Sequence, residues 1–149
     1  MSGNFYEDEL RRSLRSKFQS EEIRDLGDSS EFFDRLMEYY PTSGSKINWR
    51  IIPNSIEELE ENIDLQSAAF SQFFDALIAK FGLVGNVIYA GDSLTDAAFE
   101  GDLIDIRESL PELLEIPHHH YFIASDFSWC ICLTMEGDMG FGFNPSFNK

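Results

Sequence analysis

The chain has 149 residues, 43% of them hydrophobic, and its 27 acidic and 11 basic side chains give a formal net charge of −16. This length and apolar content argue against disorder and predict one domain over residues 1–149. The acidic balance argues against direct nucleic-acid binding and against anionic membrane surfaces, because both require Lys and Arg. It favours a cationic partner.

Signals for export are not found in the sequence. Residues 1–9 have neither the basic region nor the apolar region of a signal peptide, and no apolar run approaches membrane-spanning length. Cys130 and Cys132 are separated by one residue, which is a poor disulfide framework. We therefore expect a cytoplasmic protein.

Helices are expected in the first forty residues. Apolar side chains recur four residues apart over residues 10–18, which is the spacing of one helix face. A second apolar stripe covers residues 32–40, with Ser29 or Ser30 as the N-cap and Pro41 as the stop.

A strand and a long helix are expected next. Residues 47–52, with the sequence INWRII, are rich in β-branched and aromatic side chains and predict the first strand. Ser55 followed by Glu58 has the pattern of a capping box. It opens a predicted long helix, which carries apolar side chains on one face over residues 56–77, can break near Asp64, and ends at Gly82 or Gly85.

The second half changes its hydrophobic period. Residues 94–110 are predicted to be partly helical, and residues 111–117 to form a short helical turn. The chain is therefore predicted to be α+β, with N-terminal helices packed on one face of an antiparallel sheet. That sheet is expected to have about four to six strands, formed mainly by the C-terminal half. Strands are expected at residues 87–90, 120–124, 129–135 and 140–143, the last three as a meander.

Residues 91–94, Gly-Asp-Ser-Leu, resemble the first motif block of the GDSL esterases, in which the serine is the nucleophile. The resemblance implies a hydrolase that uses Ser93. A nucleophilic serine also needs a base and an orienting carboxylate, and the sequence has no late D-x-x-H block to supply them. The nearest string is Glu-Ile-Pro-His at residues 115–118. A strand followed by a turn and a helix N-cap explains residues 91–95 without catalysis, so we predict no enzyme activity.

Three consecutive histidines, His118, His119 and His120, together with Cys130 and Cys132, raise the question of a zinc site. Consecutive residues alternate between the two faces of a strand, so at most two of the histidines can point the same way. A Cys-x-Cys spacing within one strand also differs from the usual zinc knuckle. We therefore predict no metal and no cofactor.

Acidic side chains dominate residues 92–138, where eleven acids stand against one base, Arg107. Acids on helices and turns are often only a solvated surface. A cationic partner would, however, be attracted by such a segment. We select its densest run and its final turn as the partner-binding residues: Asp92, Asp96, Glu100, Asp102, Asp105, Glu136 and Asp138.

The segment HHHYFIASDFSWCICLTMEGDMGFGF at residues 118–143 resembles the ending of small immunity proteins of bacterial polymorphic-toxin and contact-dependent growth inhibition systems. Those proteins often end with an aromatic-rich meander that contains a Trp strand and an acidic glycine turn. The resemblance implies a cytoplasmic inhibitor that binds one cognate toxin domain.

The charge of the chain favours the same function by a separate route. Many nuclease toxins are basic because they grip phosphate, and an acidic protein can cover such a site. Two alternatives stay open. One is an acidic adaptor or nucleic-acid mimic that binds another basic protein, and the other is a small hydrolase that uses Ser93.

Overall fold

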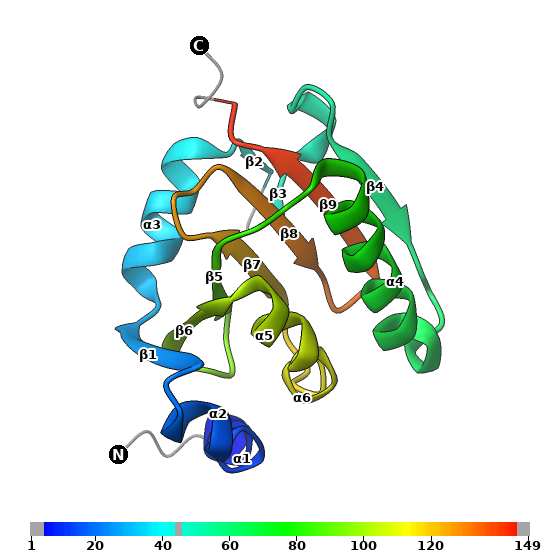
Figure 1. Cartoon of the computed structure of the whole chain (residues 1–149). Helices are drawn as coiled ribbons and strands as arrows, with labels where there is room; N and C mark the ends of the chain where they lie inside the picture. The colour runs from blue at the N-terminus through cyan, green and yellow to red at the C-terminus, as the bar shows by residue number, and fades with distance from the viewer. Residues whose placement is uncertain (1–4, 44–45, 146–149) are drawn as a thin grey trace.

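A seven-stranded antiparallel sheet forms the frame of the molecule, with strand order β1-β6-β5-β7-β8-β9-β4 (Figure 1). The computed structural model describes residues 5–43 and 46–145. The α+β fold class is confirmed, and the sheet is larger than expected. Its strands are β1 (Ile23–Asp28), β4 (Ile56–Leu59), β5 (Asn86–Gly91), β6 (Ala97–Asp102), β7 (His120–Ala124), β8 (Trp129–Leu133) and β9 (Asp138–Phe143).

Helices cover both faces of this sheet, whereas one covered face was expected. Strand β5 shows why: Val87 and Tyr89 belong to one apolar cluster, and Ile88 and Ala90 belong to the other. The first cluster is covered by α1 (Phe5–Ser13), α2 (Arg15–Gln19), α4 (Ile63–Phe81), α5 (Leu103–Glu108) and α6 (Leu110–Leu113). The second is covered by α3 (Ser30–Tyr39), the 3-10 helix η1 (Trp49–Ile51) and the ribbon of β2 (Thr42–Ser43) and β3 (Lys46–Ile47).

The C-terminal meander forms as expected. Strands β7, β8 and β9 pair in sequence order, with Trp129, Ile131 and Leu133 on one face of the central strand. Cys130 and Cys132 lie on the other face, both buried and both free thiols. The two expected N-terminal helices are also present, as α1 with α2 and as α3.

The long helix predicted after Ser55 is wrong in its first part, whereas its end is correct, since Gly82 is the C-cap of α4. Residues 56–59 form the edge strand β4 and pair with β9, so the cross-strand hydrogen bonds override the local capping-box pattern. The side chain of Ser55 donates to the carbonyl of Trp49 at 2.6 Å and caps no helix. The true N-cap of α4 is Asn62, whose side chain accepts from the backbone N–H of Asp64 at 3.0 Å.

The strand predicted over residues 47–52 is also wrong, because most of this segment forms η1. The reason is packing of Trp49, which lies against the glycines of β9. A Cβ atom on Gly140 would lie 2.1 Å from Nε1 of Trp49, so the indole needs the bare backbone there.

Two further strands were not anticipated. Residues 97–102, which were expected to be partly helical, form β6, and only the residues after Asp102 form a helix. Strand β1 had no predicted counterpart, since its sequence IRDLGD is mostly polar. Its burial pattern explains the miss: Ile23 is buried, Leu26 is partly buried, and the rest of this edge strand is exposed.

Candidate protein-binding cleft

An acidic cleft lies where the β1–α3 junction meets the turn between β5 and β6. Asp28 at the end of β1 pairs with Ala97 at the start of β6, and the backbone N–H of Ser29 donates to the carbonyl of Asp96 at 2.9 Å. These contacts bring segments more than sixty positions apart into one wall. The acidic cleft has a volume of about 420 Å³ and is lined by Asp28, Ser29, Ser30, Phe33, Asp34, Gly91, Asp92, Ser93, Thr95 and Asp96.

The charges of the acidic cleft are all of one sign. Its lining holds four aspartates and neither Lys nor Arg. Within the described part of the chain, the carboxylates of Asp34 and Asp96 have no ion-pair partner. Arg35, the neighbour of Asp34, is turned to the ring of Phe127, with its guanidinium carbon 4.3 Å from the ring centroid.

Backbone hydrogen bonds hold the other two aspartates in place. Oδ1 of Asp28 accepts from the backbone N–H of Ser30 at 2.8 Å, and hydrogen bonds from Ser30 lower the pKa of this carboxyl. Oδ1 of Asp92 accepts from the backbone N–H of His119 at 3.1 Å. The backbone of the fold thus fixes the positions of these two carboxylates at the rim of the acidic cleft.

The buried carboxylate of Glu7 fixes the β5–β6 turn to helix α1. Its Oε1 accepts from the backbone N–H of Asp96 at 2.7 Å and from that of Ala97 at 3.0 Å. Arg11, one turn later on α1, donates to Glu7 at 3.1 Å and to Asp25 of β1 at 2.8 Å. The sequence did not reveal Glu7, Asp28 and Asp34 as neighbours of this turn. The pairing of β1 with β6 brings Asp28 there, with Asp34 of α3 following it, and long-range hydrogen bonds bring Glu7 of α1.

The predicted run of acids is divided between the two ends of the β5–β6 hairpin. Asp92 and Asp96 lie at the turn, but Asp102 pairs with Asn86 at the opposite end. Asp102 is the N-cap of α5 and accepts from the backbone N–H of Ile104 at 3.1 Å. It therefore holds a helix rather than extending the acidic cleft.

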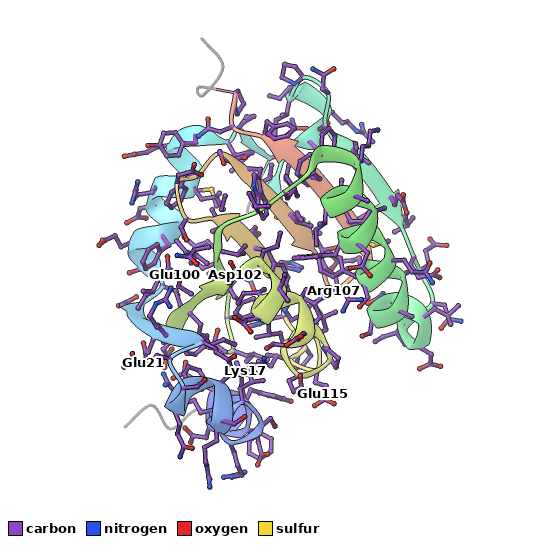
Figure 2. The ribbon with its side chains drawn as sticks, viewed as in Figure 1. Lys17, Glu21, Glu100, Asp102, Arg107 and Glu115 are labelled. Carbon is purple, nitrogen blue, oxygen red and sulfur yellow. The ribbon has the colours of Figure 1, made fainter. Side chains whose placement is uncertain are left out.

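Glu100 and Asp105 each form an ion pair with a basic side chain. Arg24 of β1 contacts Glu100 at 2.9 Å, and Lys17 of α2 lies 3.5 Å from Asp105. Figure 2 labels Glu100 and Lys17. Burial opposes ionisation of Glu100, but hydrogen bonds from Ser125 and Arg24 outweigh it and lower the pKa of its carboxyl. These two acids stabilise the junction of sheet and helices.

Glu136 and Asp138 lie in the β8–β9 turn, outside the acidic cleft. Glu136 pairs with Lys46 at 2.7 Å, and the backbone N–H of Asp138 donates to Thr134 at 3.1 Å. The link to the acidic cleft runs through His119, whose Nδ1 accepts from the backbone N–H of Met135 at 2.9 Å while its own backbone N–H reaches Asp92.

A buried chain of hydrogen bonds accounts for the other two histidines. The hydroxyl of Tyr89 lies 2.8 Å from Nε2 of His118 and 2.8 Å from Nδ1 of His120. The backbone N–H of Leu94 donates to Nδ1 of His118 at 3.0 Å. This bond fixes the proton of His118 on Nε2, so Tyr89 accepts from His118 and donates to His120.

Both rings are neutral at physiological pH. Burial lowers the pKa of His118 to about 4 and that of His120 to about 3. The two rings share a face of the sheet with Tyr89, whereas Cys130 and Cys132 lie on the other face. Accordingly, no group of three or more His, Cys, Asp or Glu side chains suited to a metal ion occurs among the described residues.

Ser93 lies exposed at the acidic cleft, and no histidine nitrogen of the described chain is hydrogen-bonded to its hydroxyl. Both ring nitrogens of His118, the nearest candidate base in sequence, are already bound. The Gly of this motif has a packing role, because a Cβ atom on Gly91 would lie 1.8 Å from the His118 ring. The N-cap expected within residues 91–95 is absent, since a strand follows.

Comparisons with known proteins leave the family open. No protein-family model matches the sequence, and a search of curated proteins gives no significant relative. In residues 5–43 and 46–145, no helix is both long enough and apolar enough to cross a membrane.

Proposed function

We propose that this chain is a cytoplasmic immunity-type inhibitor that binds and neutralises a basic, nuclease-like toxin domain, with the acidic cleft at the centre of its interface. The observation that carries the proposal is the concentration of four aspartates around a cleft whose lining has no basic side chain. Other acids of the predicted set are already neutralised by Arg24, Lys17 and Lys46. The cleft thus gathers four acids that no Lys or Arg of its lining neutralises, and such a concentration of charge can steer a basic surface to this end of the sheet.

A pull-down with two matched proteins identifies the partner. The wild-type chain and an Asp34→Asn, Asp92→Asn, Asp96→Asn variant each capture basic proteins from the source cell, and the partner is the protein that only the wild type retains. Asp28 is left intact because it binds the first turn of α3. The proposal expects the partner to stop growth when expressed alone and to be harmless when co-expressed with this chain.

Association rates then test the role of the cleft. A control variant, Glu57→Gln, Glu58→Gln, Glu61→Gln, removes the same number of charges from exposed positions at the opposite edge of the sheet. We expect the cleft variant to associate about tenfold more slowly than wild type at low salt, with the difference shrinking at high salt. Equal slowing of both variants would show that only the net charge matters and that the interface lies elsewhere.

The acidic-adaptor alternative differs in what the partner does. A captured basic protein that is harmless when expressed alone would favour an adaptor or a nucleic-acid mimic over an inhibitor. Competition separates these two, because a mimic is displaced by nucleic acid and an adaptor is not.

A further inference from the structure

Thr95 is an anomaly inside the acidic cleft. Its side chain is only 4% exposed, and its hydroxyl has no hydrogen-bond partner within the described part of the chain. Buried hydroxyl groups are normally hydrogen-bonded, because leaving one unpaired loses its interaction with water without replacement. Thr95 also lines the acidic cleft. Its oxygen is covered in the structure, so a ligand bound in the cleft supplies the missing partner only after the Thr95 side chain rotates about χ1.

The lining selects a cation with several N–H donors. Four aspartates attract positive charge, yet no cluster suited to a metal ion exists among the described residues. The carboxylates surround a space of about 420 Å³, far above the roughly 30 Å³ of one water molecule. A planar guanidinium, with five N–H donors in a fixed fork, can reach separated acceptors at the same time.

An aromatic ring completes the match to arginine. Phe33 lines the acidic cleft and is held edge-to-face against Tyr121, with ring centroids 5.1 Å apart. Guanidinium groups stack on aromatic rings, and the methylene stem of arginine packs on apolar surface. Lysine carries a compact ammonium that cannot form the same fork.

We propose that the acidic cleft binds the guanidinium group of an arginine side chain, with Thr95 Oγ1 and the carboxylates of Asp34 and Asp96 as acceptors. In the cell this arginine would belong to the basic partner, and that source rests on the proposed function above. The chemistry of the cleft itself does not depend on it, so it can be tested with a small probe.

The test is an NMR titration of the full isotope-labelled chain with N-acetyl-arginine methylamide. Saturable shifts are expected at the backbone amides of Ser29, Ser93 and Asp96. The uncharged citrulline analogue should bind at least about tenfold more weakly, and the lysine analogue should fall between the two. Asp96→Asn should weaken the arginine probe, whereas Glu57→Gln at the far edge should not.

Thr95 has its own pair of variants. Thr95→Val removes the hydroxyl at nearly constant shape and should weaken arginine binding about fivefold. Thr95→Ser keeps the hydroxyl and should bind like wild type, which separates loss of the acceptor from damage to the fold. Shifts that fail to saturate, or equal affinities in all Thr95 variants, would overturn the proposal.

The two proposals can fail separately. If the cleft variant slows association with the basic partner but the arginine probe does not bind, the proposed function stands without this anchor. If the probe binds but no toxin depends on the cleft aspartates, the arginine site stands and the proposed function fails.

Discussion

Tyr89 is the hydrogen-bond partner that the buried histidines His118 and His120 share. Its hydroxyl accepts from His118 and donates to His120, and it therefore joins β5 to both rings at the entry to β7. The three consecutive histidines raised the question of a zinc site, and no group of side chains suited to a metal ion occurs among the described residues. The sequence could not reveal Tyr89 as their partner, because it is 29 positions from His118 and the two meet only through strand pairing.

Replacing Tyr89 by Phe should destabilise the protein by about 2–3 kcal/mol. The change leaves a buried N–H of His118 and a buried nitrogen acceptor of His120 without partners. Urea unfolding measures the loss. Tyr121→Phe is the control, since Tyr121 is also buried but no hydrogen bond of its hydroxyl occurs in the described chain. Equal losses of stability in Tyr89→Phe and Tyr121→Phe would contradict the chain of hydrogen bonds through Tyr89.

The same histidines make stability depend on pH. Above pH 6.5 both rings are neutral in the folded and the unfolded chain, so they contribute no pH dependence. Below that value the unfolded chain takes up protons, whereas the folded rings resist protonation until about pH 4 for His118 and about pH 3 for His120.

The free energy of unfolding should therefore fall by about 5 kcal/mol between pH 7 and pH 4.5 from these two groups. Unfolding curves at several pH values measure the fall, and NMR titration of the ring protons assigns it. Ring midpoints near pH 6.5 in the folded protein would show the prediction to be wrong.

Ser93→Ala should leave biological activity unchanged. The Ser93 hydroxyl is exposed, and no histidine in the described chain is hydrogen-bonded to it as a base. The free energy of unfolding of the Ser93→Ala variant should differ from that of wild type by less than about 0.5 kcal/mol, as expected for an exposed residue that caps no helix. Assays with simple esters are the direct check, and activity in wild type that disappears in Ser93→Ala would restore the hydrolase interpretation.

At the scale of elements, the sequence predicts the helices and strands that have a strong hydrophobic period. It does not predict the elements that form only through contacts with distant parts of the chain. The meander and the helices α1, α3 and α6 follow from apolar spacing and stop signals. Strand β1 has little apolar pattern, and β4 carries a helix-start motif, so both depend on their partner strands. The acidic cleft was half predicted for the same reason. Asp92 and Asp96 come from a visible acidic run, whereas Asp28 lies on the unpredicted β1 and Asp34 lies on α3, which reaches the turn only because β1 pairs with β6.

Helix α1 offers a test of how the cleft is held. Glu7→Ala should lower stability by about 2–4 kcal/mol, because two backbone N–H groups of the β5–β6 turn and Arg11 lose their acceptor. Amide exchange at Asp96 and Ala97 should rise. Glu9→Ala on the same helix is the control, since it removes only an exposed pair with Arg12 and should change stability by less than about 1 kcal/mol. Unchanged exchange at the turn would exclude the role of Glu7.

At the scale of the whole molecule, the acids at the two ends of the β5–β6 hairpin have different tasks. At the turn, acids without basic neighbours surround a cleft. At the opposite end, Glu100, Asp102 and Asp105 bind Arg24, the start of α5 and Lys17. The net charge of −16 alone does not distinguish these tasks.

A variant that changes these three residues to Gln or Asn should separate the two tasks. Glu100→Gln, Asp102→Asn, Asp105→Asn should lose about 1–3 kcal/mol of stability, through the lost ion pairs and the weakened cap. Its association rate with the basic partner should match that of the far-edge control variant. The cleft variant should show the reverse, with slow association and little loss of stability. If the first variant associates as slowly as the cleft variant, the interface includes both ends of the hairpin.

The edges of the sheet limit how another chain can attach. On one side, β1 is interrupted by a bulge between Asp25 and Gly27. On the other side, β4 is only four residues long and carries Glu57 and Glu58. A bulge and charged side chains both discourage the addition of a further strand, which is the common route to aggregation. We therefore expect the proposed partner to bind side chains at the ends of the strands, and not to add an extra strand to the sheet.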